Sequence, residues 1–381
     1  MKKFVRIASF FFALFFFGLI TDVFSHPAWG IVVDRNRQIY FSDLETIYKI
    51  DSQGKLSIFR AGVSGRHIHD LSIDAGGTLY GWDNSYEPQT QKHLRAFWKM
   101  SSGGEYTEII PLTENPPSGM SIWRDSSGNM YAAEPWNNEK RESKIIKRTA
   151  DGKTTLFAGG NYGYSDGEKQ KAKFGVILDV AFAKDNSIYL TDSNRVRKLD
   201  KFGIVKTIYP DKVEEKNQKE SKTASQLFGL DVDEQNNVFA ADFANSRLLK
   251  ISSDGKVSTF FTSEKDWSPI GAATFGNEVY LLEGRVYSAS KHNGTRVLKI
   301  SADGKSTIVA NLGDSNKSNS DSNNLQFETK EEKNFVSNSD TNSTNTVKNR
   351  LNFYGIVGAI IIVLAGLVIF VSKNNQSTKR S

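Results

Sequence analysis

The histidines and aspartates that lie closest together in the sequence are the residues best suited to bind a ligand or to do chemistry. The segment Arg66-His67-Ile68-His69-Asp70 places two of the five histidines beside a carboxylate. Alternate residues of an extended strand point to the same side, so the rings of His67 and His69 are predicted to share a face. An imidazole can ligate a metal ion or act as a general base near neutral pH. The segment therefore predicts a candidate site.

The elements that must position these residues form a repeat. An apolar residue, an aromatic residue, two variable positions and an acid recur six times. The acids of the six copies are Asp43, Asp83, Glu134, Asp192, Asp242 and Glu283. Such a period predicts a repeat architecture in which every unit contributes the same supersecondary element.

Two further patterns complete each unit. A lysine stands five residues before a glycine, as in Lys250 to Gly255, and a β-rich run follows the glycine. Another apolar alternation precedes each aromatic. Each unit thus holds four short strands, which predicts an all-β, six-bladed β-propeller of four-stranded blades over residues 26–312. No detached N-terminal strand is evident, so we expect packing between the first and last blades to close the ring.

The innermost strand of a propeller blade begins at the face where the second strand ends. This rule places six strand starts around one mouth of the central channel, two of which are the acids Asp70 and Asp179. The residues predicted to form a ligand-binding site at this mouth are Trp29, His67, His69, Asp70, Glu134, Trp136 and Asp179.

Two interpretations of this mouth stay open. Asp70 and Asp179, with His69 as a further candidate, could hold a divalent cation, and oxygen ligands favour calcium. Alternatively, the carboxylates accept hydrogen bonds from backbone amides and the histidines line the entrance. The six recurring acids are interpreted as structural, because a residue that every unit requires holds the unit together. They are expected to accept turn amides or to pair with a nearby Arg195 or Arg247.

Blade five carries the clearest resemblance to a known family. Gly229-Leu-Asp-Val-Asp233, then Asn237-Val-Phe-Ala-Ala-Asp242 and Asn245-Ser-Arg247-Leu-Leu-Lys250 resemble the NHL repeat, as does the linker from Ala158 to Gly167. The resemblance implies a six-bladed propeller that serves as a protein-binding, RNA-binding, sensor or catalytic module.

Gluconolactonase-type propellers are a more distant resemblance. Their first blade starts with Glu-Gly-Pro-x-Trp, and that glutamate ligates a divalent cation in the channel. The matching stretch here is Ser25-His26-Pro27-Ala28-Trp29, so the metal-ligand glutamate is not matched.

The two ends of the chain predict export and anchoring. Residues 1–25 have the layout of a signal peptide, with Lys2, Lys3 and Arg6 before an apolar run. Residues 351–372 are apolar and long enough to span a bilayer. A Ser/Asn-rich stalk (313–350) and a short cytoplasmic tail (373–381) are predicted around this span, in a single-pass, type I orientation with the propeller on the extracytoplasmic side.

The composition and the motifs exclude several classes of function. The chain has no cysteine, which excludes disulfides and thiolate metal sites, and most of its net charge of +6 lies at the two ends, which argues against nucleic acid as a partner. No nucleotide-binding loop, serine nucleophile elbow or zinc-protease motif is present. The sequence thus favours a membrane-tethered module that binds a protein, peptide or glycan without a required cofactor. A metal-dependent lactonase-like or hydrolase-like enzyme at the channel mouth is the alternative.

Overall fold

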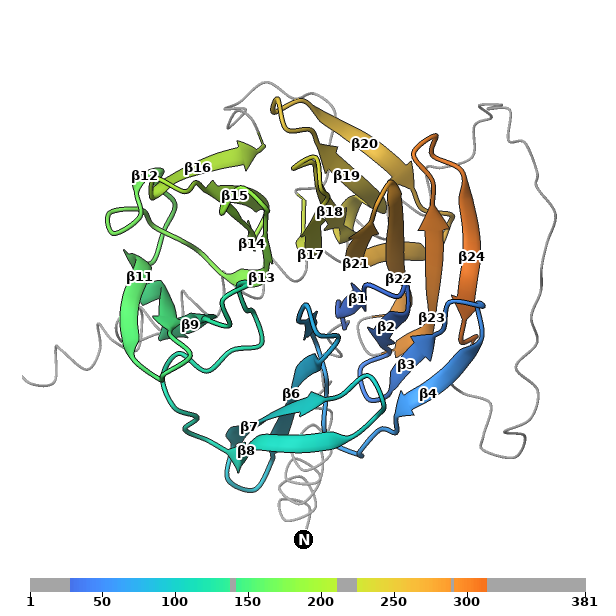
Figure 1. The fold of residues 1–381 in the computed structure, drawn as a ribbon, viewed down its shortest axis with the longest axis horizontal. Coiled ribbons are helices and arrows are strands. Elements are labelled where there is room, and N and C mark those ends of the chain that lie inside the picture. The colour runs from blue at the N-terminus through green and yellow to red at the C-terminus, as the bar shows by residue number, and fades with distance from the viewer. Residues whose placement is uncertain (1–27, 138–141, 211–224, 289–290, 314–381) are drawn as a thin grey trace, which may run out of the picture. The chain divides into compact units, whose positions relative to one another are not determined.

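The strands of this chain are short, are joined by tight turns and form six separate antiparallel sheets (Figure 1). The computed structural model describes residues 28–137, 142–210, 225–288 and 291–313. The predicted signal peptide, stalk beyond Gly313, membrane span and tail lie outside these ranges. Within the described ranges, no helix is long and apolar enough to cross a membrane.

The first three sheets follow one another in chain order. Blade 1 consists of β1 (Ile31–Val33), β2 (Ile39–Ser42), β3 (Ile47–Ile50) and β4 (Leu56–Arg60). Blade 2 consists of β5 (Leu71–Ile73), β6 (Leu79–Glu87), β7 (Lys92–Met100) and β8 (Tyr106–Thr113). Blade 3 consists of β9 (Met130–Asn137), β10 (Glu142–Arg148) and β11 (Thr154–Asn161).

The last three sheets complete the set. Blade 4 consists of β12 (Gly167–Glu168), β13 (Ile177–Phe182), β14 (Ile188–Asp192), β15 (Arg195–Leu199) and β16 (Ile204–Tyr209). Blade 5 consists of β17 (Leu227–Val232), β18 (Val238–Asp242), β19 (Arg247–Ile251) and β20 (Val257–Thr262). Blade 6 consists of β21 (Trp267–Phe275), β22 (Glu278–Ser288), β23 (Lys291–Ile300) and β24 (Ser306–Asn311).

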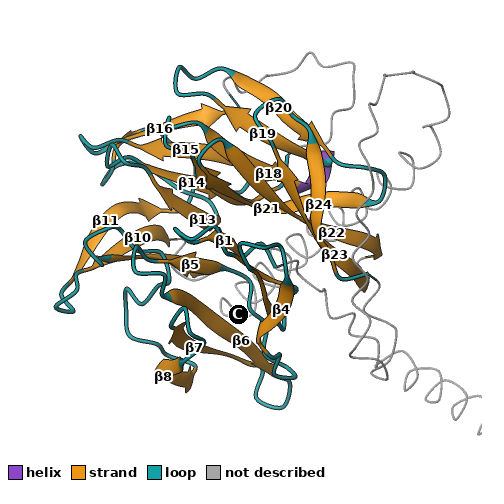
Figure 2. Ribbon diagram, turned by 45° about the vertical axis from the view of Figure 1, so that its right-hand side comes forward, coloured by secondary structure: helices purple, strands orange, loops and turns teal. Residues whose placement is uncertain are grey.

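The six sheets stand around a common axis. Figure 1 shows β1, β13, β17 and β21 nearest the centre and β4, β8, β16, β20 and β24 at the periphery. The one helical element among the described residues is the short 3-10 turn η1 (Phe243–Asn245), as Figure 2 makes clear. The prediction of an all-β, six-bladed propeller is therefore confirmed.

The prediction of four strands in every blade is wrong for two blades. In blade 3 the segment expected to form the inner strand, residues 119–123, is irregular and pairs through the isolated bridge Arg124–Met130. Pro116 and Pro117, which lack an N–H, precede it, and Gly119 has a φ of 76°, which a strand does not allow. Blade 4 instead gains a fifth strand, because β12 pairs with the outer edge of β16.

The recurring acids hold the blades together. Asp83, Asp192, Asp242 and Glu283 are fully buried. Their arginine partners, at nitrogen–oxygen distances of 2.6–2.9 Å, are Arg60, Arg197, Arg247 and Arg296 respectively. The structural interpretation of these acids is confirmed for these blades, as is the pairing of Arg247.

The expected role of Arg195 is wrong. Its guanidinium lies over the ring of Tyr164, at 3.9 Å from the ring centroid, and donates to Asn194. Arg197, two residues along β15, takes its place beside Asp192. Arg195 therefore contacts Tyr164, from the linker before blade 4, instead of Asp192.

Packing between blades 1 and 6 closes the ring, as predicted. Ile31 and Phe41 of blade 1 share one core cluster with Ile270 and Leu282 of blade 6. Gly271 lies so close to blade 1 that a Cβ there would meet the carbonyl oxygen of Trp29 at 2.1 Å. Glycine at this start of an inner strand is thus required for close approach between neighbouring blades.

We predict that Arg197→Met lowers the free energy of unfolding by about 3–5 kcal/mol, because it leaves Asp192 buried without its counter-charge. Arg197 is itself fully buried and also donates to the carbonyl oxygens of Lys173 and Ser165. Urea unfolding of the wild type and the variant measures the loss. The control is Lys184→Met, which breaks the exposed pair with Glu234 and should cost less than about 1 kcal/mol. Equal effects of the two variants would contradict this account.

Candidate functional site

Two cavities meet at the innermost residues of the propeller. The first, here called the channel cavity, has a volume of about 610 Å³ and is lined by the inner strands of blades 1, 2, 4, 5 and 6. The second, here called the tryptophan pocket, has a volume of about 370 Å³ and lies among residues of blades 2, 3 and 4. Trp29 and Trp123 line both cavities, so these two indoles separate them.

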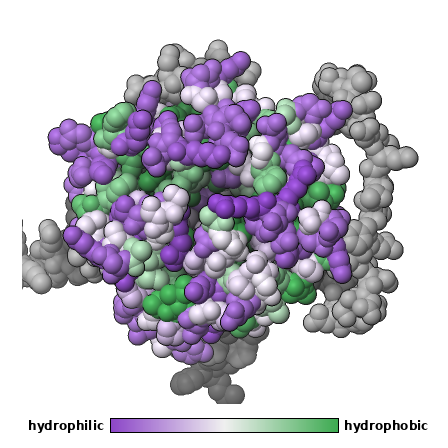
Figure 3. Space-filling model, viewed as in Figure 1, coloured by the Kyte–Doolittle hydropathy of each residue, from purple (hydrophilic) through white to green (hydrophobic). Residues whose placement is uncertain are grey.

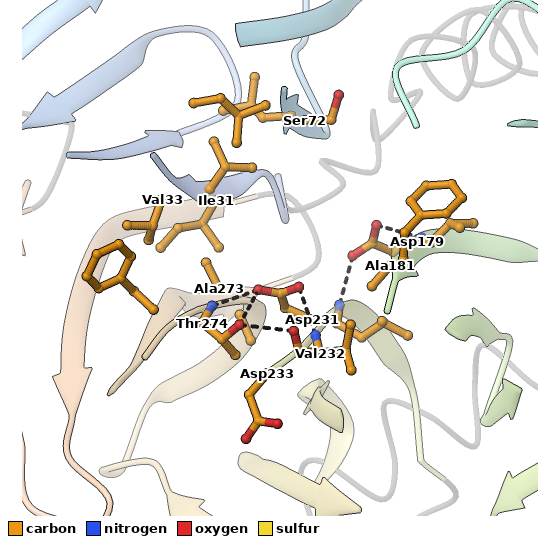
Figure 4. A pocket seen from close by; sticks show the side chains of 18 of the residues that line it. Ile31, Val33, Ser72, Asp179, Ala181, Asp231, Val232, Asp233, Ala273 and Thr274 are labelled. Carbon is orange, nitrogen blue, oxygen red and sulfur yellow. Dashed lines mark hydrogen bonds between the residues drawn. The ribbon is translucent and has the colours of Figure 1, made fainter. Parts of the chain in front are cut away.

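The channel cavity is lined by the buried carboxylates of Asp34, Asp70 and Asp179 and by the half-buried carboxylate of Asp231. Asp70, Asp179 and Asp231 each bond to a neighbouring blade. Asp179 accepts from the backbone N–H of Leu230 (2.8 Å), and Asp231 accepts from the backbone N–H of Thr274 (2.7 Å), as Figure 4 shows. Asp70 accepts from Nε1 of Trp123 (2.8 Å).

Burial governs the protonation of these three groups. Loss of hydration raises the pKa of Asp70 to about 7 and that of Asp231 to about 6, although hydrogen bonds oppose both shifts. Burial also raises the pKa of Asp179 well above its usual range, and the nearby charge of Asp70 adds to the effect. The channel cavity therefore holds carboxyl groups that retain protons at a pH at which exposed carboxyl groups are ionised.

The two predicted histidines lie beside the first blade rather than in either cavity. The carbonyl oxygen of His69 accepts from the backbone N–H groups of Trp29 (2.8 Å) and Gly30 (2.9 Å), which joins blades 1 and 2. The ring of His69 lies 5.5 Å from that of Trp29 and 6.2 Å from that of His67, between ring centroids. The two histidines lie outside any strand, so the prediction that their rings share the face of a strand stays a prediction.

The carboxylates give limited support for a metal. Each carboxylate oxygen of Asp70 and Asp179 already accepts one N–H, from Leu71, Trp123, Val180 and Leu230. Across the described part of the chain, no group of three or more His, Asp or Glu side chains could hold a metal ion. Calcium prefers six to eight oxygen ligands. A calcium site at Asp70 and Asp179 therefore stays a prediction that rests on two residues.

The tryptophan pocket exists because blade 3 lacks an inner strand. The irregular segment contributes Met120, Ile122 and Trp123 to its wall. The hairpin of β6 and β7 contributes Trp82 and Arg95. Most of the remaining lining is apolar, from Phe97, Ala132, Ala133, Val176, Ile177 and Leu178.

The polar groups of this pocket are mainly donors. The guanidinium of Arg95 lies over the ring of Trp82, 4.5 Å from its centroid, and burial lowers its pKa. The buried Nε1 atom of Trp82 has no acceptor within the described residues, whereas the indole of Trp29 acts on Asp70, whose pKa it lowers. Glu134 is the acid of the pocket, and its carboxylate is engaged by Ser118 (2.8 Å) and Lys144 (3.2 Å).

The structure thus brings most of the predicted site residues together, but in two groups. Trp29, Asp70 and Asp179 line the channel cavity, and Trp29 also meets Glu134 in the tryptophan pocket. Trp136 belongs to β9, and its side chain lies outside the description.

Sequence reasoning missed four residues of the site, namely Trp82, Arg95, Trp123 and Asp231. The repeat offered a signal for Asp231, which follows Gly229 in the NHL-like motif of an inner strand. Arg95 gave none, because it belongs to no repeated position, and the structure places it where β6 and β7 extend their hairpin beyond the length of the other blades' early strands.

We predict that the stability of the protein falls as the pH rises from about 5 to about 7.5. Asp70 and Asp231 keep protons in the folded state that the unfolded chain loses near pH 4, so raising the pH favours unfolding. Asp70→Asn should reduce this loss by an amount on the order of a few kcal/mol. Urea midpoints at several pH values measure it, with the exposed Glu234→Gln as the control. An unchanged slope in Asp70→Asn would refute the assignment.

The comparisons with known proteins concern the fold. No family model matches the sequence, and no curated protein matches it. Among solved structures, virginiamycin B lyase from Staphylococcus aureus is 14% identical with a TM-score of 0.40, and the match covers 76% of this chain and 95% of that one. A luciferin-regenerating enzyme is 16% identical with a TM-score of 0.46, covering 71% and 89%.

A gluconolactonase from Xanthomonas campestris is 12% identical with a TM-score of 0.43, covering 68% of this chain and 84% of that one. At identities this low, structural likeness concerns the fold and not the reaction. The six sheets of the chain itself show the six-bladed β-propeller, and these proteins are solved structures to which it is similar.

Proposed function

We propose that this protein is a membrane-tethered propeller that binds a protein, peptide or glycan ligand on the extracytoplasmic side, with the tryptophan pocket as its binding site. The observation that carries the proposal is the chemistry of that pocket. Its volume lies within the range of about 300–1,000 Å³ that is typical of ligand pockets. Three tryptophans and one arginine line it, residue types that dominate binding energies in interfaces.

The surroundings of the pocket support an extended ligand. Val176, which lines the pocket, is 46% exposed, and Tyr164 is 42% exposed. Tyr164 packs against Gly175 of the pocket wall, where a Cβ would meet its hydroxyl oxygen at 2.4 Å. Apolar side chains exposed beside a pocket favour a ligand that continues past the rim.

Hydrophilic side chains make up most of the propeller face in Figure 3, with smaller hydrophobic patches between them. The tethering part of the proposal rests on the signal-like residues 1–25 and the apolar residues 351–372.

We predict that Trp82→Ala weakens ligand binding at least about tenfold, because a truncated central aromatic is typically worth 2 kcal/mol or more. The measurement is binding of the purified full chain to glycan and peptide arrays, followed by titration of the best ligand. Phe202→Ala is the control, since Phe202 is 80% exposed on the outer hairpin of blade 4. Full retention of binding by Trp82→Ala, or no binding to either array, would argue against the proposal.

The second candidate function is a metal-dependent lactonase-like or hydrolase-like enzyme that uses the channel cavity. The observation in its favour is that Asp70 lies close enough to Asp179 to raise the pKa of that group. A divalent cation between the two carboxylates would remove this repulsion.

We predict that the thermal unfolding midpoint stays the same with calcium, with zinc and with EDTA. Every oxygen of Asp70 and Asp179 already accepts an N–H, and the described residues supply no cluster of three ligands. A rise of the unfolding midpoint with one cation, lost in Asp70→Asn or Asp179→Asn, would contradict this prediction. It would favour the enzyme over the binding module and justify a screen of esters and lactones.

A further inference from the structure

The tryptophan pocket offers donors and a positive charge that no described residue uses. Arg95 makes no ion pair and no side-chain hydrogen bond with another described residue, although it is half-buried. The Nε1 atom of Trp82 is buried without an acceptor in the same part of the chain, whereas the indole of Trp29 serves Asp70 of the channel cavity. Buried donors are normally satisfied, so the indole of Trp82, with the guanidinium of Arg95 beside it, favours a ligand that brings acceptor atoms.

The charge of the pocket matches a monoanion. Arg95 is the one lysine or arginine in its lining, and the one acid there, Glu134, is engaged by Lys144, which also pairs with Glu142 at the same distance of 3.2 Å. Arg95 is therefore the charged side chain of the lining that no described residue of opposite charge pairs with. A guanidinium binds a carboxylate through two parallel hydrogen bonds, and a carboxylate carries the single negative charge that would balance Arg95.

The walls of the pocket specify the rest of the ligand. Phe97, Met120, Ile122, Ile177 and Leu178 present apolar surface and no hydrogen-bonding side-chain atoms. A body rich in hydroxyl groups would leave those groups without partners, which is costly in a buried site. An apolar body is thus favoured over a sugar ring.

We propose that the tryptophan pocket binds the C-terminal residue of a peptide, with its carboxylate on Arg95 and its apolar side chain among the tryptophans. This inference rests on the proposed function and names the ligand of the same site. The volume of about 370 Å³ suits one terminal residue, and the exposed Val176 and Tyr164 lie where the preceding residues would leave the pocket.

The test compares three probes on the purified full chain in detergent micelles, by calorimetry and by tryptophan fluorescence. They are acetyl-Gly-Gly-Phe with a free carboxylate, the same peptide as its C-terminal amide, and N-acetylphenylalanine. The free peptide should bind at least about tenfold more tightly than its amide, since a hydrogen bond to a charged group is worth about 1.5–3 kcal/mol. It should also bind more tightly than N-acetylphenylalanine, which lacks the residues that pass the rim.

The variants assign the effect to Arg95. Arg95→Met should abolish the preference for the acid over the amide, and Arg95→Lys should retain part of it because the charge remains without the planar fork. Arg35→Met is the matched control, since Arg35 lines the channel cavity and not this pocket. The preference of the Arg35→Met variant for the acid over the amide should equal that of the wild type. Unfolding midpoints of all variants identify any that fail to fold.

The outcomes distinguish failure of the carboxylate inference from failure of the proposed binding function. Equal binding of acid and amide to the wild type would overturn the carboxylate inference and leave the pocket as a binding site. Binding of N-acetylphenylalanine as tight as that of the peptide acid would replace the peptide with a free carboxylate. Failure of every probe would overturn the inference, and the Trp82→Ala array experiment would then decide the proposed function.

Discussion

Six separate sheets must be joined into a ring although no strand passes from one blade to the next, and this constraint accounts for the polar groups at the centre of the molecule. Buried carboxylates provide part of the join. Asp179 and Asp231 each accept a backbone N–H from the inner strand of the following blade, and Asp70 accepts from Trp123. Burial also raises the pKa values of these three carboxyl groups. Raised pKa values are typical of catalytic groups, but here they belong to residues that join neighbouring blades.

The same constraint accounts for the tryptophan pocket, the proposed binding site. Blade 3 has no inner strand to bond to its neighbours, and its irregular segment leaves space between blades 2 and 4. Some groups around this space join neighbouring blades, as Trp123 does through Asp70. However, neither the guanidinium of Arg95 nor the Nε1 atom of Trp82 forms a hydrogen bond with a described residue. Arg95 and the indole of Trp82 therefore keep donors that a ligand can use.

The repeat allowed the fold to be predicted from the sequence, because every blade carries an acid and a turn glycine at equivalent positions, and the acid is fully buried in four of the six blades. Exceptions to the repeat were harder to place. The recurring acids were predicted to accept turn amides or to pair with an arginine such as Arg195, which is opposite Asp192 in the β-ladder. Asp192 instead pairs with Arg197 and accepts the backbone N–H of Gly175, while Arg195 lies over the ring of Tyr164. Of the candidate mouth residues, Asp70 and Asp179 line the channel cavity, whereas His67 and His69 line neither cavity. Whether a carboxylate is free or bonded to the next blade depends on side-chain packing that the sequence does not display. Trp123 was expected in a strand, and its role as a wall between two cavities follows from the absence of that strand.

Each blade is built from consecutive strands, and blade 6 meets blade 1 through side chains and close backbone approach rather than through an exchanged strand. The junction between the ends of the propeller is therefore of the same kind as the five junctions within it. A circular permutation would join the two ends of the propeller and place the new ends in a loop between two other blades. Such a permutation would interrupt no β-ladder. The connecting loops set the order of the blades around the axis. The contacts between neighbouring blades hold the ring together, and they would be the same in a permuted chain.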